Sequence, residues 1–174
     1  MIIEAKALWQ SLIDKGSAKD SQFEQGLMLQ EGAAEDEFLE LEITLNVKLP
    51  KEMKAFYQIH NGQKDDLGIN AFVRNLTLSP ISEIIENWAF LQEEFDPDEL
   101  ELEADQKVKP VLWSPSWIPI AHNGGGDYLC LDTDPEEDGR YGQVLYFWHD
   151  WGKRAVEAEH LFAFIRMCLE EEND

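Results

Sequence analysis

The fold is decided by residues 117–150, which read WIPIAHNGGGDYLCLDTDPEEDGRYGQVLYFWHD. The run Asn-Gly-Gly-Gly-Asp at residues 123–127, called the glycine corner below, separates two apolar segments. Glycine permits the positive φ that a tight chain reversal requires. Residues 128–132 and 143–148 are rich in aromatic and branched side chains and are bounded by turn residues, which is typical of strands. With residues 118–121 as a shorter partner, the stretch predicts an antiparallel meander at the centre of a sheet.

The composition is strongly acidic. Of 174 residues, 36 are Asp or Glu and 14 are Lys or Arg, giving a formal net charge of −22. Nucleic-acid binding needs clusters of Lys and Arg, and anionic membranes repel acidic chains, so we expect neither partner. A basic protein is the favoured partner, because opposite charges accelerate encounter. The alternative is that the excess acid serves solubility alone.

The chain is expected to form one soluble, cytoplasmic domain over residues 1–174. Hydrophobic residues make up 44%, which is too many for disorder, and the length suits a single core. Cys130 and Cys168 lie far apart in apolar surroundings, so buried free thiols are expected rather than a disulfide. The N-terminus lacks the pattern of a signal peptide, and no apolar run is long enough to span a membrane.

Apolar residues recur with helical spacing in several segments. We expect helices at residues 2–13, ended by Gly16; at 35–45, ended by Asn46; from Pro50 to Asn61-Gly62; from a cap at Ser82 through Leu91; and at 159–171. Beyond the meander, we expect an edge strand ending at Leu78 and strands at residues 108–113 and 153–158. This order of helices and strands predicts an α+β domain.

Residues 95–106, FDPDELELEADQ, are the main break in composition and are called the acidic insertion below. Repulsion among the carboxylates predicts an exposed, mobile loop, with a helical turn as the alternative. Because the strands that complete the core lie downstream, the insertion is expected to interrupt the domain without dividing it.

The histidines invite an acid–base or metal hypothesis. His122 precedes the glycine corner, where a carboxylate from Asp127 or Asp150 would tune its basicity, and His149 follows a predicted strand. No ligand spacing such as His-x-x-x-His occurs. We therefore expect no metal, no cofactor and no catalytic residue. A metal-dependent hydrolase that uses His122, His149 and Asp127 is kept as a remote alternative.

Other catalytic and binding motifs are incomplete. The glycine corner lacks the Lys and Ser/Thr of a phosphate-binding loop, and no Gly-x-Ser-x-Gly sequence occurs. Residues 132–138 resemble the start of a calcium loop, but Glu137 and Gln143 occupy the positions that need glycine and a bidentate acid. A solvated acidic turn is preferred there, with weak calcium binding as the alternative.

Several tryptophans lie near the predicted hairpins. They either pack half-buried with their N–H groups satisfied, or anchor a partner beside the glycine corner, as exposed Trp often does. Under the second interpretation, the predicted partner-binding residues are Trp113, Trp117, Asn123, Gly124, Gly125, Gly126, Asp127, Trp148, His149, Asp150 and Trp151.

Two blocks of residues resemble the SUKH superfamily, which includes fungal Smi/Knr cell-wall assembly regulators and many bacterial immunity proteins. The first block runs from Leu49-Pro50 through Phe56 to Asn61-Gly62. The second contains Trp-Ile-Pro-Ile-Ala at 117–121, the glycine corner, Leu131-Asp132, Gly142-Gln143-Val144 and His149-Asp150. In this order and spacing the resemblance covers about residues 35–171.

The resemblance implies a mixed, largely antiparallel sheet with helices packed on one side, and no catalytic activity. Bacterial members of the family imply an immunity protein that binds and neutralises a cognate toxin, and the charge favours a basic toxin domain such as a nuclease. The alternative that the family implies is a Smi/Knr-type regulatory or scaffold protein in cell-wall signalling.

Overall fold

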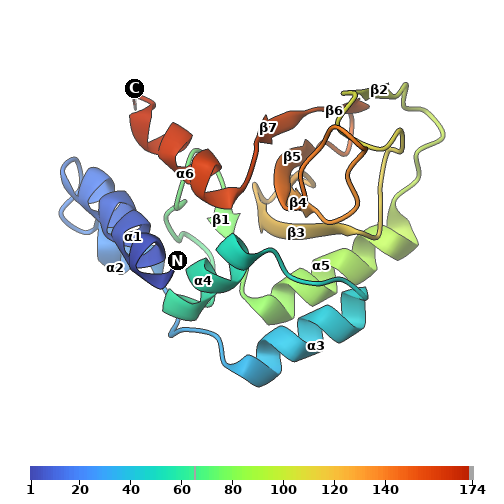
Figure 1. The fold of residues 1–174 in the computed structure, drawn as a ribbon. Helices are drawn as coiled ribbons and strands as arrows, with labels where there is room; N and C mark the ends of the chain where they lie inside the picture. Colours follow the sequence, from blue (N-terminus) through green and yellow to red (C-terminus); the bar gives the residue numbers. More distant parts are fainter. Residues whose placement is uncertain (65, 173–174) are drawn as a thin grey trace.

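A computed structural model describes residues 1–64 and 66–172 (Figure 1). The helices are α1 (Ile2–Ser17), α2 (Phe23–Leu27), α3 (Glu35–Leu45), α4 (Lys51–Ile59), α5 (Ile81–Glu94) and α6 (Leu161–Glu170). The strands are β1 (Thr77–Leu78), β2 (Glu103–Ala104), β3 (Trp117–His122), β4 (Tyr128–Asp132), β5 (Gln143–Phe147), β6 (Lys153–Arg154) and β7 (Val156–Ala158). The predicted α+β class is confirmed.

The main sheet has the strand order β1-β3-β4-β5-β7, and every neighbouring pair in it is antiparallel. The predicted meander β3-β4-β5 forms its centre, and β1 is an edge strand as expected. Tyr128 pairs with both His122 and Phe147, so the end of β3, the start of β4 and the end of β5 lie at the same end of the sheet. This register carries the glycine corner and residues 148–151 to the same end of the sheet.

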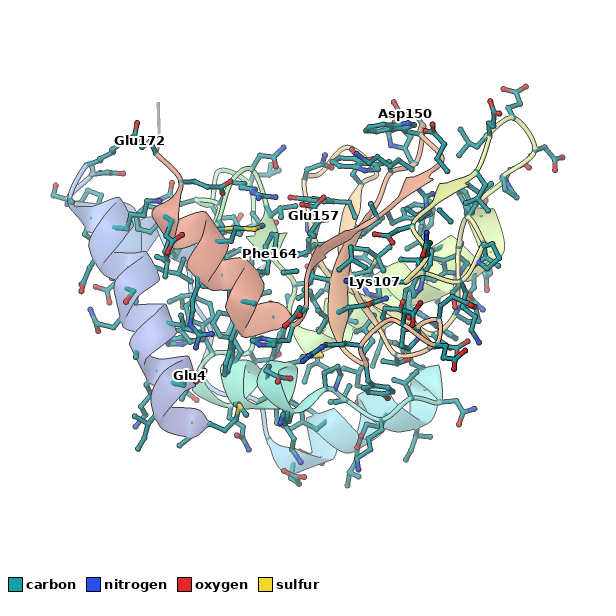
Figure 2. All side chains as sticks on the ribbon, turned by 45° about the horizontal axis from the view of Figure 1, so that its top comes forward. Glu4, Lys107, Asp150, Glu157, Phe164 and Glu172 are labelled. Atoms are coloured by element: carbon teal, nitrogen blue, oxygen red, sulfur yellow. The ribbon has the colours of Figure 1, made fainter. Side chains whose placement is uncertain are left out.

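One face of the sheet is covered by helices. In α1 the buried residues Ala5, Leu8, Trp9, Leu12 and Ile13 recur every three or four positions, so they form one stripe. Trp9 stacks on Phe56 of α4 with ring centroids 4.3 Å apart, and its indole N–H donates to the Phe56 carbonyl over 3.0 Å. Phe164 brings α6 into the same cluster, called the helical core below (Figure 2).

The opposite face of the sheet packs mainly against irregular chain. This far-face core contains the buried residues Leu91, Val108, Trp117, Tyr128, Cys130, Leu145 and Phe147, with Phe95, Trp113 and Val156 packed against them. Trp113 meets the rings of Trp117 and Phe147 edge-on, at 5.9 and 5.6 Å between centroids. Much of this cover comes from residues 95–113, in the connection between α5 and β3.

A buried arginine ties this connection to the sheet. Arg154 has no exposed surface, and its guanidinium donates to the carbonyl oxygens of Leu112, Trp148, Trp151 and Lys153 over 2.7–3.1 Å. The guanidinium also lies 4.7 Å from the centre of the Phe147 ring. Burial lowers the pKa of Arg154 to about 10, which leaves it charged at neutral pH. Backbone dipoles therefore solvate this buried cation.

Two predicted strands are wrong in detail. Residues 108–113 form no strand: Pro110 has no N–H to donate to a ladder, and Val108 instead fills the far-face core. Residues 153–158 divide at Ala155 into β6, which pairs in parallel with β2, and β7, which pairs with β5. The parallel pairing implied by the family resemblance thus lies in a separate two-stranded ribbon, and the main sheet is wholly antiparallel.

Two further expectations need correction. The acidic insertion is largely exposed as expected, but it includes β2, where the Glu103 N–H donates to the Gly152 carbonyl over 2.9 Å. Ser82 does not cap α5: the helix begins directly after Pro80, and Ser82 lies in its first turn. The Ser79 hydroxyl donates to the Glu83 carboxylate over 2.9 Å near this end.

Candidate partner-binding site

The glycine corner has a backbone that requires glycine. Gly124 and Gly126 have φ values of +80° and +100°, which other residues rarely adopt. A Cβ on Gly126 would also lie 3.1 Å from the His149 ring, tighter than an ordinary contact. The corner therefore turns sharply and at the same time brings its backbone against the chain that leaves β5.

Side-chain hydrogen bonds hold the corner in this shape. The Asn123 amide donates to Asp127 Oδ2 over 2.8 Å, and the Asn123 Oδ1 accepts from the N–H groups of Gly125 and Asp127 over 2.8 and 3.3 Å. The Asn123 N–H also donates to the Asp127 carbonyl. Asn and Asp here close the loop on itself, so the corner is a preorganised unit rather than a linker.

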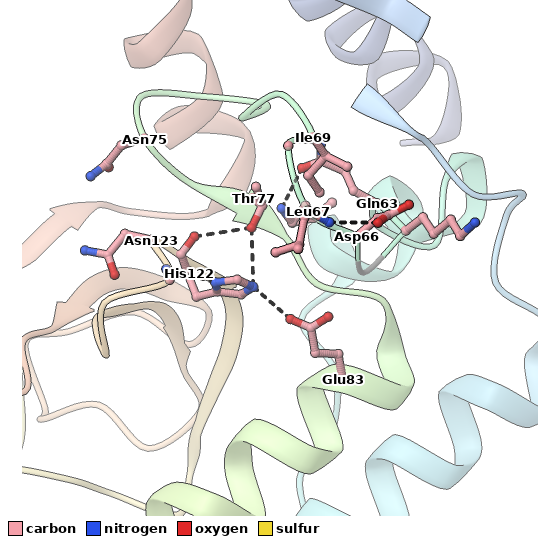
Figure 3. A pocket seen from close by; sticks show the side chains of 13 residues that line it. Gln63, Asp66, Leu67, Ile69, Asn75, Thr77, Glu83, His122 and Asn123 are labelled. Atoms are coloured by element: carbon pink, nitrogen blue, oxygen red, sulfur yellow. Dashed lines mark hydrogen bonds and ion pairs between the residues drawn. The ribbon is translucent and has the colours of Figure 1, made fainter. Parts of the chain in front are cut away.

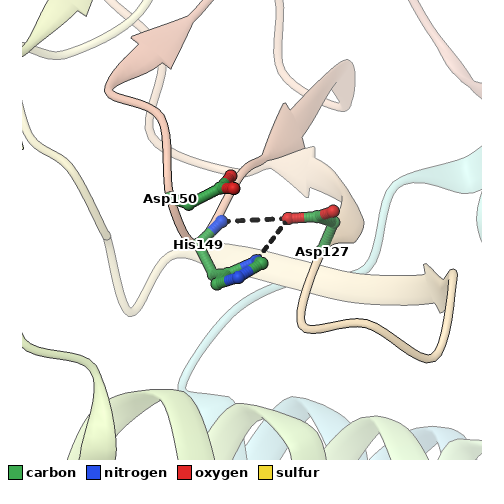
Figure 4. A group of neighbouring side chains, drawn as sticks. All are labelled: Asp127, His149 and Asp150. Carbon is green, nitrogen blue, oxygen red and sulfur yellow. Dashed lines mark hydrogen bonds and ion pairs between the residues drawn. The ribbon is translucent and has the colours of Figure 1, made fainter.

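Asp127 also joins the corner to the segment after β5 (Figure 4). Its Oδ1 accepts from the His149 N–H over 3.0 Å and lies 2.8 Å from the ring nitrogen Nδ1. Burial alone would raise the pKa of Asp127, but the hydrogen bonds from His149 and Asn123 outweigh it and hold this pKa below its ordinary value. The carboxylate is thus a fixed negative group with 14% of its side chain exposed.

His122 lies on another side of the corner and pairs with a carboxylate that was not predicted. Its Nε2 is 2.8 Å from Glu83 of α5, and its Nδ1 accepts from the Gly124 N–H over 3.1 Å (Figure 3). The hydrogen bond from His122 is the largest cause of a lowered pKa at Glu83. The sequence had raised a pairing of His122 with Asp127 or Asp150 only as a hypothesis, and the carboxylate that contacts His122 is instead Glu83 of α5.

The surroundings of His122 do not form a nucleophilic relay. A cavity of about 210 Å³ lies beside it, lined in part by Gln63, Thr77 and Glu83. The Thr77 hydroxyl is 3.3 Å from Nε2, the same ring nitrogen that contacts Glu83. A Ser/Thr-His-acid triad needs the hydroxyl and the acid on different nitrogens, so that one orients the ring while the other loses its proton. This arrangement positions the ring without activating Thr77.

The thiols are equally poor nucleophiles. Cys130 and Cys168 are both buried and free, as predicted. Burial raises the pKa of Cys168 to about 12 and raises that of Cys130 further. Only the thiolate is reactive, so both side chains act as small apolar residues in their cores.

The tryptophans divide between core and surface. Trp117 is completely buried in the far-face core, so its predicted role in touching a partner is wrong. Trp113 is half-buried over Trp117, and its N–H donates to Gln92. Trp151 is 47% exposed and lies 6.2 Å from Trp148, which stacks on Tyr146 at 4.5 Å. An aromatic row of Tyr146, Trp148 and Trp151 therefore extends outward from β5.

The remaining predicted residues gather beside this row. Asn123, Gly124, Gly125, Gly126 and Asp127 share the end of the sheet with Trp148, His149, Asp150 and Trp151, and Figure 2 shows Asp150 at the surface. Glu103 of the acidic insertion accepts a hydrogen bond from the Trp151 indole over 3.1 Å, which the sequence did not reveal. We call the exposed part of this set, residues 123–127 and 148–151, the corner surface.

The acidic turn at residues 132–138 is neither fully solvated nor arranged like a calcium loop. Asp132 is fully buried and accepts from the Asp134 N–H and the Gln143 amide, both over 2.9 Å. Burial is the largest cause of its raised pKa. Within the described residues, the carboxylates of 132–138 do not converge as a group of three metal-ligating side chains. The Asp132 carboxylate therefore stabilises the turn through these hydrogen bonds.

Comparison with known families identifies the fold. Residues 32–167 match the SMI1 / KNR4 family (SUKH-1). The chain belongs to this family. Among its SMI1/KNR4-family relatives is a protein of Neurospora crassa named "Glucan synthesis regulatory protein", 26% identical over 82% of this chain. The Schizosaccharomyces pombe "Cell wall biosynthesis/cell cycle regulator smi1" is 27% identical over 85% of it.

A third relative, the Saccharomyces cerevisiae "Cell wall assembly regulator SMI1", is 23% identical over 79% of this chain. The matched parts are 34%, 32% and 34% of the three relatives, so this SMI1/KNR4 chain spans about a third of their length. All three relatives are named as regulators. Across residues 1–64 and 66–172, no helix is long and apolar enough to cross a membrane.

Proposed function

We propose that this protein is a non-enzymatic, protein-binding module of the regulatory SMI1/KNR4 kind, which binds a basic partner through the corner surface. The fungal relatives with matching sequence are named as regulators of cell-wall assembly or glucan synthesis. A regulator of this kind acts by contacting an endogenous protein. We favour a regulatory role over an immunity role, because the related proteins are named as regulators.

The observation that carries the proposal is the exposed Trp151 beside acidic groups. Trp151 is 47% exposed, Asp150 precedes it in the chain, and Glu103 accepts a hydrogen bond from its indole N–H. Large aromatic side chains are frequent anchors of protein interfaces, and rim carboxylates attract a basic partner. The network around Asn123 and Asp127 fixes the neighbouring backbone before binding, which lowers the entropic cost of association.

The side chains best suited to catalysis, His122 and the two thiols, support a non-enzymatic role. His122 contacts both Thr77 and Glu83 through one nitrogen, and burial raises the pKa of both thiols. These groups hold the structure together rather than exchange protons with a substrate. A recognition role needs only a shaped, charged surface, which the corner surface supplies.

A partner captured from the native host with the intact chain tests the proposal. Binding of that partner is then measured by biosensor for wild type, Trp151→Ala and Asp150→Lys. We expect each variant to weaken binding about tenfold or more, as interface anchors do. Ile3→Ala is the matched control: it removes a 79% exposed apolar side chain from α1, a helix that packs on other helices.

Two outcomes contradict the proposal. Variants that bind like wild type would remove the corner surface from the interface. An association rate that is unchanged between low and high salt would contradict charge steering, because screening weakens attraction between exposed charges. Far-UV circular dichroism and melting of each variant establish that the fold is retained.

An immunity protein is the second candidate, and the net charge of −22 is the observation that favours it. A nuclease toxin must be basic to hold nucleic acid, so an acidic inhibitor would be steered to its active surface. Inhibition of a toxin domain encoded next to this chain's gene, lost in Asp150→Lys, would support this candidate. A captured partner with an endogenous regulatory role and no toxic activity would reject it.

A further inference from the structure

We propose that Asp127, His149 and Asp150 bind one divalent transition-metal ion at the end of the sheet (Figure 4). Each residue offers one ligand atom, and these three atoms all lie within 4.8 Å of one another. Asp127 comes from the glycine corner before β4, whereas His149 and Asp150 follow β5. The ligands therefore belong to two separate connections that the sheet register brings together.

The convergence is built by the strands rather than by flexible surface chain. Tyr128 pairs with Phe147, so the residue before β4 lies opposite the first residue after β5, and the N–H of the next residue, His149, donates to the Asp127 carboxylate. The Asp127 Oδ1 is already 2.8 Å from the His149 Nδ1, a distance at which two ligand atoms can share one ion. The exposed Asp150 offers the third ligand atom, within 4.8 Å of the other two.

Outer groups orient the ligands as they do in metal centres. The Asn123 amide holds Asp127 Oδ2 over 2.8 Å and the His149 N–H donates to Oδ1 over 3.0 Å, so this carboxylate has a fixed direction. The Gly126 backbone leaves room for the imidazole where a Cβ would press on it at 3.1 Å. These contacts set the ring and the carboxylate before any ion arrives.

The ligand types select the ion. One imidazole and two carboxylates suit zinc, manganese or ferrous iron, whereas calcium and magnesium prefer oxygen ligands alone. The metal would occupy the place of the proton between Asp127 and His149, and that proton would move through solvent to the other ring nitrogen or to water. His149 has 49% of its side chain exposed, so water can complete the coordination shell.

The same corner provides an internal contrast. His122 contacts the carboxylate Glu83 and its other ring nitrogen accepts from the Gly124 backbone, and among the residues described no second acid completes a group of three there. Among the residues that the structure describes, Asp127, His149 and Asp150 form the one group of three such ligands. A hydrolase site combining His122 with His149 and Asp127 does not assemble.

The test is calorimetric titration of the chelator-treated full chain with zinc sulfate. We expect one zinc ion per chain. His149→Gln and Asp150→Asn should each weaken binding at least tenfold, and Asn123→Ala should weaken it about 10–100-fold by releasing the Asp127 carboxylate. His60→Gln is the control, because it removes another imidazole, at the end of α4, and should leave the affinity unchanged.

The result that overturns the proposal is zinc binding that is equal in wild type, His149→Gln and Asp150→Asn, which is diffuse attraction to acidic surface. Absence of zinc binding by wild type would reject it as well. His149 and Asp150 are exposed, so both variants are expected to keep their melting temperature in chelator. Because the chain is measured alone, failure here leaves the proposed protein partner untouched.

Discussion

The two faces of the main sheet are covered by different means. The helical core packs periodic stripes of α1, α4 and α6 against one another, as in the Trp9–Phe56 stack at 4.3 Å, and reaches the sheet through α5 and α6. The far-face core packs aromatic rings under irregular chain that is held by Arg154 and by the short β2–β6 ribbon. The difference teaches that one domain can combine a core fixed by side-chain shape with a core fixed by backbone hydrogen bonds.

The largest expected effect comes from the helical core. Phe56→Ala removes a completely buried ring that stacks on Trp9, and we expect a loss of about 3–5 kcal/mol in the free energy of unfolding. Urea unfolding followed by tryptophan fluorescence and circular dichroism measures it. Phe90→Ala, at a ring that is 57% exposed, is the control. A loss below about 1 kcal/mol would mean that the two faces do not differ in this way.

The second largest effect is expected in the far-face core alone, at Arg154. Arg154→Ala leaves four carbonyl oxygens without their donor, and we expect a loss of about 3 kcal/mol. Hydrogen exchange should become faster first at the amides of Glu103 and Asp105, which donate to the Gly152 and Arg154 carbonyls, while β3–β5 remain protected. Arg140→Ala, at a side chain that is 67% exposed, is the control. Uniform loss of protection on both faces would contradict the proposed division.

The smallest effect belongs to the corner that both faces share. Asp127→Asn removes the charge that accepts from His149 and Asn123, and we expect a loss of about 1–2 kcal/mol at pH 7. Because the folded pKa of Asp127 lies below its ordinary value of 3.8, this stabilisation is present above that value and disappears as pH falls through the folded pKa.

Unfolding of wild type and Asp127→Asn between pH 7 and pH 3 checks this sign. The difference between them should be largest at neutral pH and shrink in acid. A difference that is constant across this range would show that the charge of Asp127 contributes nothing. Loss of signal from both cores at one denaturant concentration would place the corner in the cooperative unit that they share.

Most of the helical core could be predicted from the sequence, because its signals are local, although α1 continues through Gly16, its expected end, to Ser17. The spacing of Ala5, Leu8 and Trp9 marks the buried stripe of α1, and Asn46 ends α3 with φ of 55° as expected. The meander was likewise predicted from its glycine corner and its aromatic strands. Hydrophobic period and turn chemistry act over a few residues, so a single sequence records them.

The chain that covers the far-face core could not be predicted, because the contacts that place it are long-range. A two-residue parallel pairing of β2 with β6 leaves no periodic pattern, and nothing near Arg154 in the sequence points to the Leu112 carbonyl. For the candidate site, the neighbourhood of Asp127 and His149 was predicted from the strand ends. The pairing of His122 with Glu83 was missed, since it depends on how α5 packs against β3.

Arg154 carries a consequence for how this chain can change over generations. Its guanidinium donates to main-chain carbonyl oxygens, which every amino acid possesses. These hydrogen bonds therefore do not depend on which side chains occupy positions 112, 148, 151 and 153. The buried Arg154 therefore allows surface residues such as Trp151 to be substituted while the backbone beneath them stays in place.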